Sequence, residues 1–349
     1  MITKIVKTDE GNIDMQAIAE AGKIIKEGGL VAFPTETVYG LGGDALNGDS
    51  SEKIYAAKGR PSDNPLIIHI AQMDALPKIV KEIPEAAYKL AERYWPGPLT
   101  MIFDKADCVP LETTGGLSTV AVRMPSNRIA RALIEASGGY IAAPSANRSG
   151  RPSPTVAKYV IEDLDGRVDM IIDGGEADIG LESTIIDLTG DKPMILRPGY
   201  ITEEMLGQIV GGIDVDQTII DGNSTKAPKA PGMKYRHYAP KGNLTIVEGQ
   251  ADQVSAYINE QLHIYKNKGS KTGVIATDET AGNYRADSVK SAGERKQEEQ
   301  IAKHLFRILR EFDDEGVEVI YAESFDQKGV GQAIMNRPLK AAGHQVIRL

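Results

Sequence analysis

Five cationic side chains stand at the ends of predicted helices or strands, where folding can bring them together. They are Lys58, Arg60, Arg123, Arg148 and Arg197. Gly59 and Pro61 end a helical pattern, so the first two should leave the helix end together. A guanidinium offers a planar pair of donors to phosphate or carboxylate, and an ammonium offers a compact charge. The alternative is that these charges neutralise a helix terminus or lie on a solvated surface.

Two stretches of small polar residues could complete such a pocket. Residues 34–42 read Pro-Thr-Glu-Thr-Val-Tyr-Gly-Leu-Gly, and residues 143–154 contain Ser145, Asn147 and Ser153 after a predicted strand. Open α/β sheets bind ligands at strand ends, which favours a ligand-binding interpretation. An ordinary turn remains the competing interpretation, with Thr35 or Thr37 capping a helix. His69, inside an apolar run, could equally be a core histidine.

Composition excludes several classes of protein. The 349 residues carry 40 Lys plus Arg against 49 Asp plus Glu, a net charge of −9, so a broad basic surface for nucleic acid is not expected. Walker A, kinase, glycosidase and metal-site patterns are missing from the sequence. The single cysteine, Cys108, excludes an internal disulfide and fits a reducing cytoplasm; we expect it to be a small buried residue.

The length predicts two domains, because single cores stop growing near about 250–300 residues. Residues 1–210 alternate a helix at 14–27 and further helical segments with short apolar runs, which predicts a mixed α/β sheet. The runs lie at 30–33, 66–70, 99–103, 120–123, 140–143, 170–173 and 184–188.

Residues 211–242 change to Gly, Pro, Lys and Thr and predict a linker. Residues 243–349 then alternate strands at 244–247, 273–276, 317–321 and 346–348 with helices at 251–268, 294–314 and 333–342. This alternation predicts a smaller, parallel, Rossmann-like domain. It lacks G-x-G-x-x-G after a strand, so dinucleotide binding is not expected.

Taken together, these motifs resemble the Sua5/YrdC/YwlC family. The resemblance rests on Lys58-Gly-Arg60, on Ser145-Ala-Asn147 and on the 34–42 segment. Residues 231–240, Pro-Gly-Met-Lys-Tyr-Arg-His-Tyr-Ala-Pro, and the α/β unit after them are similar to the linker and C-terminal domain of the longer members. The resemblance therefore covers nearly the whole chain.

The resemblance implies a nucleotidyltransferase that makes L-threonylcarbamoyladenylate from L-threonine, bicarbonate or CO2, and ATP. Pyrophosphate leaves, Mg²⁺ arrives on the phosphates without a dedicated protein site, and the product serves t6A37 modification of tRNA by a downstream transferase. The threonine side would comprise Thr37, His69, Arg123, Ala143 and Ser183. The ATP side would comprise Lys58, Arg60, Asn64, Thr119, Ser145, Asn147, Ser153, Arg197 and Tyr235, with Lys58 and Arg60 also stabilising the transition state.

Two anionic reactants can be brought together by cations without a covalent nucleophile. Around Tyr235 the linker could close over the nucleotide, or it could be a plain tether. Two other functions compete: an RNA-binding or translation-associated module with weak tRNA contact, and a transferase that forms carbamoyladenylate. Nothing in the sequence indicates a membrane segment.

Overall fold

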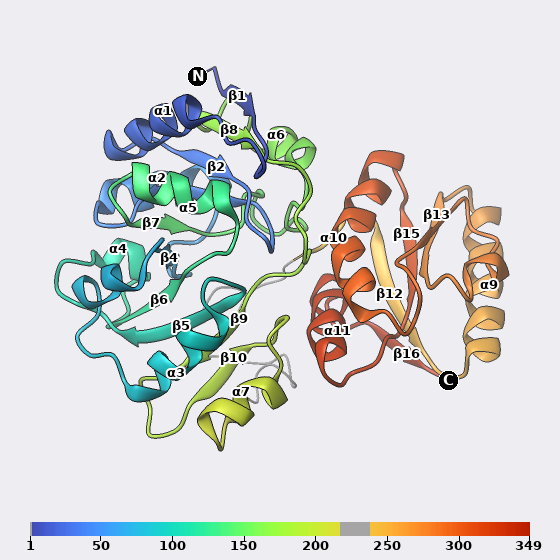
Figure 1. Cartoon of the computed structure of the whole chain (residues 1–349). Helices are drawn as coiled ribbons and strands as arrows, with labels where there is room; N and C mark the ends of the chain where they lie inside the picture. The colour runs from blue at the N-terminus through green and yellow to red at the C-terminus, as the bar shows by residue number, and fades with distance from the viewer. Residues whose placement is uncertain (1, 217–237) are drawn as a thin grey trace. The chain divides into compact units, whose positions relative to one another are not determined.

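The computed structural model describes residues 2–216 and 238–349, and it divides into two compact units (Figure 1). Within the described residues, the first unit comprises 2–149, 153–178 and 182–216. The second comprises 238–349 together with two short segments, 150–152 and 179–181. Two domains were expected from the length, but the assignment of the two short segments to the second unit was not.

The first unit is built on an 11-stranded sheet of order β1-β8-β2-β3-β7-β4-β6-β5-β9-β10-β11. Its strands are β1 Lys4–Lys7, β2 Val31–Phe33, β3 Gly40–Asp44, β4 Ile67–His69, β5 Leu99–Asp104, β6 Thr119–Arg123, β7 Ile141–Ala143, β8 Met170–Asp173, β9 Thr184–Asp187, β10 Met194–Arg197 and β11 Asp214–Val215. Strand β6 pairs parallel with β4 and antiparallel with β5, so the sheet is mixed, as the sequence predicted.

Seven α-helices of the first unit connect these strands within the described residues. They are α1 Met15–Lys26, α2 Gly48–Lys58, α3 Glu85–Tyr94, α4 Leu111–Thr114, α5 Arg128–Ala136, α6 Ala157–Leu164 and α7 Glu203–Val210, with a 3-10 helix at Met73–Lys78. Asp14 begins α1 by accepting hydrogen bonds from the backbone N–H groups of Gln16 and Ala17, both at 3.0 Å. The helix predicted at 14–27 is therefore confirmed, with Asp14 as its cap.

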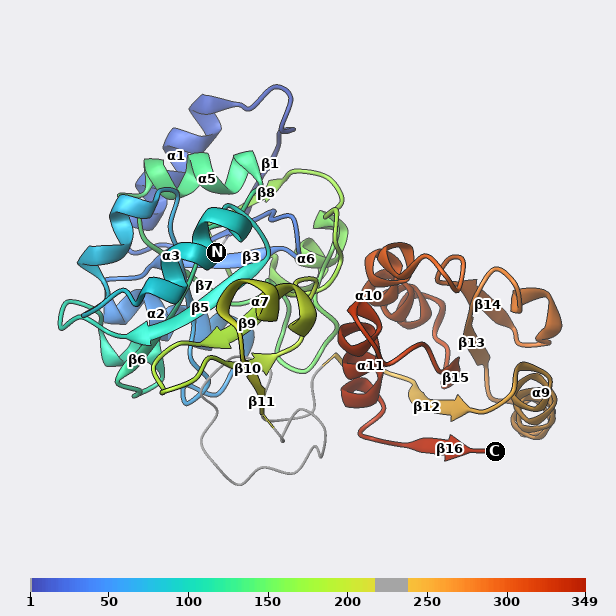
Figure 2. The same cartoon turned by 60° about the horizontal axis from the view of Figure 1, so that its bottom comes forward.

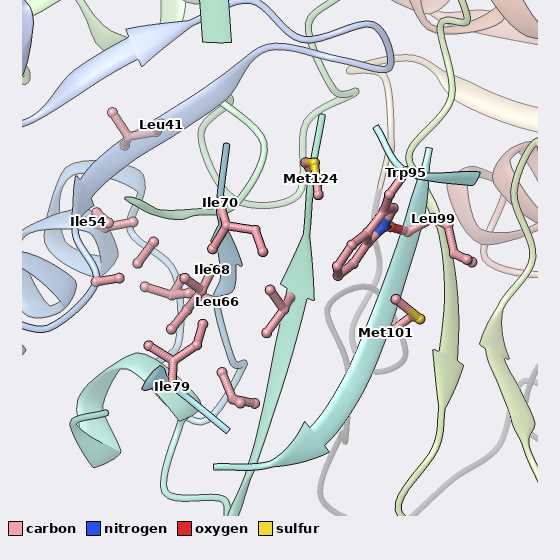
Figure 3. Close-up of a cluster of buried hydrophobic side chains, with 14 of the residues drawn as sticks. Leu41, Ile54, Leu66, Ile68, Ile70, Ile79, Trp95, Leu99, Met101 and Met124 are labelled. Atoms are coloured by element: carbon pink, nitrogen blue, oxygen red, sulfur yellow. The ribbon is translucent and has the colours of Figure 1, made fainter. Parts of the chain in front are cut away.

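Hydrophobic side chains pack on both faces of this sheet. One large cluster includes Leu66, Ile68, Met101 and Val122, and Figure 3 shows the first three of these beside Trp95 and Leu99. A second cluster joins apolar residues of α1 and α5 to β2, β7 and β8, and both views show these two helices side by side (Figures 1 and 2). The helices α1 and α5 therefore cover the strands at this end of the sheet.

A third, smaller cluster consists of strand residues only. It contains Ile67, Ile102, Ala121, Ile185 and Leu196, with Met194 packed against it. These residues alternate along their strands with members of the large cluster, such as Ile68 and Val122, so they lie on the opposite face. This face of β4, β6, β5, β9 and β10 carries most of the predicted site.

The helix considered for the end of the 34–42 segment is not formed. Instead the chain turns back into β3, which pairs antiparallel with β2 through Val31↔Gly42 and Phe33↔Gly40. A Cβ on Gly42 would lie 2.7 Å from a methyl group of Ile141 and 2.9 Å from the Phe33 ring. The glycines therefore allow a close strand pairing that a helical reading of the segment overlooked.

The second unit is a parallel, five-stranded sheet of order β14-β13-β15-β12-β16, confirming the Rossmann-like prediction. Its strands are β12 Asn243–Glu248, β13 Thr272–Ala276, β14 Ser288–Ser291, β15 Val319–Glu323 and β16 Val346–Arg348. Its helices are α9 Ala251–Asn267, α10 Glu298–Glu315 and α11 Val330–Ala341, with a 3-10 helix at Ala281–Asn283. Strand β14 was not predicted, because Ser-Val-Lys-Ser is half-exposed and carries one apolar residue.

The boundary expected at residue 211 needs correction. Strand β11 lies inside the predicted linker and pairs parallel with β10, so the first sheet continues to Val215. The helix before it ends at Gly211, whose φ of 79° lets the backbone turn back along β10. Residues 217–237 lie outside the described residues. No helix in the described ranges is long and apolar enough to span a membrane.

Candidate functional site

Strand register aligns several of the predicted residues on one face of the first sheet. His69 pairs with Arg123 across β4 and β6, and Arg123 pairs with Thr100 across β6 and β5. Paired residues on neighbouring strands project to the same side of a sheet. Ala143 pairs with Ile67 and Arg197 pairs with Ile185, so both share the face of the small strand cluster.

Hydrogen bonds link this face into a chain of polar side chains. Arg123 Nη1 donates to Thr37 Oγ1 at 2.9 Å, and Arg123 Nε reaches the carbonyl of Gly97 at 3.4 Å. Thr100 Oγ1 and Ser183 Oγ lie 2.7 Å apart. Arg197 donates to the same serine, from Nε to its carbonyl at 3.0 Å and from Nη2 to its Oγ at 3.1 Å. The structure therefore brings Thr37, Arg123, Ser183 and Arg197 together.

Arg123 also faces a buried carboxylate. Glu36 Oε1 lies 2.7 Å from Arg123 Nη2, and their side chains are 6% and 5% exposed. Despite this distance, Arg123 Nη2 and both Glu36 oxygens have no aligned hydrogen-bond partner among the described residues. A close ion pair with unaligned donors and acceptors is costly in a protein interior.

His69 is buried beside this pair and is neutral at ordinary pH. Burial, reinforced by the positive charge of Arg123, lowers the pKa of His69 to about 3. Its Nδ1 lies 3.0 Å from the Ile67 carbonyl, and its ring meets Phe33 edge-on at a centroid distance of 6.1 Å. A neutral imidazole here can accept or donate one hydrogen bond without adding charge.

The lysine of the Lys58-Gly-Arg60 motif holds the Ser145–Asn147 turn. Lys58 is 2% exposed, and its Nζ donates to the carbonyls of Ser145, at 2.5 Å, and of Asn147. Within the turn, Ser145 Oγ donates to Asn147 Oδ1 at 2.5 Å. Hydrogen bonds thus join the Lys58-Gly-Arg60 motif to the Ser145–Asn147 turn, and the Lys58 ammonium lies against two carbonyls of that turn.

The remaining ATP-side candidates lie towards the other end of the same strands. Thr119 begins β6 and Arg123 ends it, a separation of about 13 Å for four residues of extended chain. Asn64 precedes β4, which runs parallel to β6, so it lies towards the Thr119 end. Arg60 donates to the Asn64 carbonyl at 3.2 and 3.3 Å and to the Pro65 carbonyl at 3.2 Å. The candidates therefore form an elongated site rather than one compact cluster.

Ser153 is placed by a second buried carboxylate. Its Oγ donates to Glu182 Oε1 at 2.6 Å, and the two residues are 1% and 6% exposed. Glu182 immediately precedes Ser183, so this bond ties the Ser153 segment to the Ser183–Arg197 pair. Glu182 therefore lies next to the candidate residues Ser153 and Ser183, and no sequence motif indicated it.

Other expectations fare differently. The Arg148 side chain is exposed, unlike the buried Lys58, Arg123 and Arg197. Cys108 is exposed, which makes the prediction of a buried cysteine wrong. It lies in the turn after β5, where its Sγ donates to the Lys78 carbonyl at 3.2 Å. Tyr235 lies outside the described residues.

No group of three or more His, Cys, Asp or Glu side chains in the described ranges is arranged to hold a metal ion.

The sequence motifs also did not indicate two polar residues that lie beside the candidate residues, Glu36 and Thr100. Glu36 lies in a segment whose threonines were considered as ligand-binding groups. For Thr100, the available signal was a polar residue inside an otherwise apolar run.

Comparison with known proteins identifies the family of the chain. Residues 23–199 match the Sua5/YciO/YrdC family model, described as "Telomere recombination", and residues 201–343 match "Threonylcarbamoyl-AMP synthase, C-terminal domain". Proteins named threonylcarbamoyl-AMP synthase from Pyrococcus abyssi and Bacillus subtilis are 50% and 51% identical, covering 100% and 98% of this chain and 100% and 97% of their own.

A solved structure has the same architecture. The crystal structure of P. abyssi Sua5 complexed with L-threonine is 49% identical, with a TM-score of 0.93 and coverage of 100% of both chains. Full-length matches of this kind establish descent and fold together. The chain belongs to the Sua5 family of threonylcarbamoyl-AMP synthases.

Proposed function

We propose that this enzyme makes L-threonylcarbamoyl-AMP and pyrophosphate from L-threonine, bicarbonate or CO2, and ATP. The product would be the activated donor for t6A37 modification, passed in the cytoplasm to the machinery that modifies tRNA. The observation that carries the proposal is the buried set Thr37, His69 and Arg123 at the carboxyl ends of β4 and β6. The full-length likeness to a protein crystallised with L-threonine supports it.

Arg123 is the residue best placed to bind the threonine carboxylate. It is buried, it is oriented by Thr37 and by the Gly97 carbonyl, and its Nη2 has no aligned partner among the described residues. A carboxylate accepts two parallel N–H bonds from a guanidinium, which fixes both position and orientation. Neutral His69 and Thr37 beside it suit the hydroxyl of threonine, with Ala143 and Ser183 completing the pocket.

The ATP side would run from Arg197 and Ser153 to the Ser145–Asn147 turn, Arg60, Asn64 and Thr119. Threonine N-carboxylate would attack the α-phosphorus, and pyrophosphate would leave on the opposite side. Because both reactants are anions, the rate depends on positioning them and on offsetting negative charge. Lys58 would contribute by holding the Ser145 and Asn147 carbonyls. Arg60 would contribute charge beside Asn64, whose carbonyl its guanidinium contacts.

Mg²⁺ would enter with ATP and leave with pyrophosphate, as part of the substrate. The cationic site suits this role, because arginine and lysine complement phosphate oxygens that the metal leaves uncovered. Tyr235, as a further nucleotide contact, remains a prediction.

The test is a reaction with ATP, L-threonine and bicarbonate, analysed by mass spectrometry for threonylcarbamoyl-AMP and by a pyrophosphate assay. We expect both products, and we expect omission of threonine or of bicarbonate to abolish them. Pyrophosphate release that does not depend on threonine would contradict the proposal.

A further inference from the structure

The Glu36 carboxylate has no role in the reaction as described above, although it lies in the site. It is 5% exposed and sits between Thr35 and Thr37 in the segment that links β2 to β3. Thr35 Oγ1 forms hydrogen bonds within its own segment: it lies 2.9 Å from Thr37 Oγ1 and donates to the Val38 carbonyl at 2.6 Å. Among the described residues neither neighbouring threonine is bonded to the carboxylate, and the ion-pair partner of Glu36 is Arg123.

The hydrogen-bonding state of this pair is unusual for buried charges. A buried polar group without an aligned hydrogen-bond partner destabilises the fold, and a charged one does so more strongly. Within the part of the chain that the structure describes, one donor group, Arg123 Nη2, and two acceptors, Glu36 Oε1 and Oε2, have no aligned hydrogen-bond partner, although they form one ion pair. A ligand that satisfied both residues would need an anionic acceptor for Arg123 and a cationic donor for Glu36.

An α-amino acid carries both groups on a single carbon. We propose that Glu36 binds the ammonium group of the amino-acid substrate while Arg123 binds its carboxylate. The inference rests on the proposed function and adds a specificity determinant to it. The zwitterion and the Arg–Glu pair are each neutral overall, so binding exchanges one internal pair for two charge-assisted contacts without burying net charge.

This arrangement predicts which ligands are rejected. An α-hydroxy acid would meet Arg123 but leave the Glu36 carboxylate without a cation. A site built around a hydrogen-bonded charge discriminates strongly against an analogue that lacks the partner group. Glu36 would thus select free α-amino acids, whereas His69 and Thr37 would contact the side-chain hydroxyl.

The competing explanation is that Glu36 only neutralises Arg123 and keeps it in place. The two explanations differ in what they predict for a ligand without an ammonium group. If Glu36 only positions Arg123, its removal should weaken every carboxylate ligand equally. If it binds the ammonium, its removal should weaken threonine selectively.

The experiment compares L-threonine with (2S,3R)-2,3-dihydroxybutanoate, in which a hydroxyl replaces the ammonium group. Affinities are measured by calorimetry for the wild type, Glu36→Gln and Glu10→Gln. The last variant makes the same change at a carboxylate that accepts bonds from Asn127 Nδ2 and Arg128 N, neither of which is a candidate site residue. Thermal unfolding of each variant confirms that it is folded.

We expect Glu36→Gln to weaken threonine binding about 10- to 100-fold, the range of one charge-assisted hydrogen bond, while the dihydroxy acid changes about threefold at most. Glu10→Gln should leave the ratio of the two affinities unchanged. Glu36→Asp, which keeps the charge on a shorter side chain, should retain part of the preference and serves as the readout if Glu36→Gln does not fold.

Equal weakening of both ligands, or unchanged threonine binding, would overturn the role of Glu36 and leave the proposed function intact. If Glu36→Asp is the readout, an unchanged preference for threonine over the dihydroxy acid would likewise overturn it. Failure of the wild type to bind threonine would instead overturn the proposed function, and this inference with it.

Discussion

The two units bury arginines in different ways. In the first unit, Arg123 ends a strand and donates to the Thr37 hydroxyl. It also lies beside Glu36, and no described residue gives its Nη2 an aligned hydrogen bond. In the second unit, Arg310 is fully buried in α10 and gives Nε and Nη2 to the carbonyl of Pro152 at 3.0 and 2.7 Å. Arg337, also fully buried, donates to the Ala333 carbonyl in its own helix at 3.2 Å.

This difference separates burial from function. An arginine whose donors end on backbone carbonyls completes the hydrogen bonding of the fold. An arginine at a strand end, beside hydroxyls and an unaligned carboxylate, has capacity for a ligand. The burial of an arginine alone would have indicated a binding site in both units. The groups that each arginine contacts distinguish Arg123 from Arg310 and Arg337.

The largest effect should come from breaking the contact between the two sequence motifs of the first unit. Lys58→Ala removes the ammonium that holds the Ser145 and Asn147 carbonyls, and we expect turnover to fall about 10²-fold or more. Lys53→Ala is the matched control, because Lys53 lies in the same helix and donates to the Gly28 carbonyl at 2.7 Å. Pyrophosphate release measures both. Similar rates for the two variants would remove Lys58 from the site.

In the second unit the corresponding change should affect stability. Arg310→Ala leaves the Pro152 carbonyl without two buried donors, so we expect the free energy of unfolding to fall by about 2–4 kcal/mol. Arg307→Ala, in the same helix, removes a partly exposed pair with Glu311 and should cost about 1 kcal/mol or less. Urea titration followed by circular dichroism measures both. An Arg310→Ala variant as stable as the wild type would contradict the structural role.

A smaller and pH-dependent effect is expected at His69. Its pKa in the folded protein is about 3, below the ordinary value near 6.5, so the unfolded chain binds its proton first as the pH falls. Stability contributed by neutral His69 is therefore complete above pH ~6.5 and falls towards pH ~3, by up to about 1.4 kcal/mol per pH unit.

His69→Gln should remove that part of the pH dependence, whereas His263→Gln, at an exposed position, should not. Urea midpoints at pH 7 and at pH 4.5 provide the comparison. The same slope in the wild type and in His69→Gln would show that another group controls it.

The smallest effect concerns Cys108. Because its thiol is exposed and donates to the Lys78 carbonyl, which belongs to no candidate site residue, alkylation should change turnover by less than about twofold. Iodoacetamide labelling followed by the pyrophosphate assay tests this. A strong loss of activity on labelling would extend the site beyond the strand ends described above.

Much of the fold could be predicted because periodic apolar runs report directly on burial. The runs at 170–173 and 184–188 became β8 and β9 within one residue, and the alternation after residue 243 gave the parallel sheet. What failed depended on contacts distant in sequence. Residues 150–152 belong to the second unit through Arg310, some 160 positions later, which no local pattern reveals.

Part of the geometry of the candidate site was predictable as well. Arg123 and Arg197 could be found because a cation at a strand end is uncommon and suggestive. Glu36 could not, because a carboxylate in a hydroxyl-rich segment becomes informative only when strand register places Arg123 opposite it. Lys58 was predicted to contact phosphates, and its bonds to two carbonyls were invisible until the Ser145–Asn147 turn was placed.

The most direct test of the central claim is a calorimetric titration of L-threonine into the wild type and into the double variant Arg123→Met/Glu36→Gln. The double variant removes both charges together, so no unpaired buried charge remains to unfold the domain. We predict saturable threonine binding by the wild type and none by the folded double variant at the same concentrations. Equal binding by both proteins would contradict the assignment of substrate recognition to this end of the sheet.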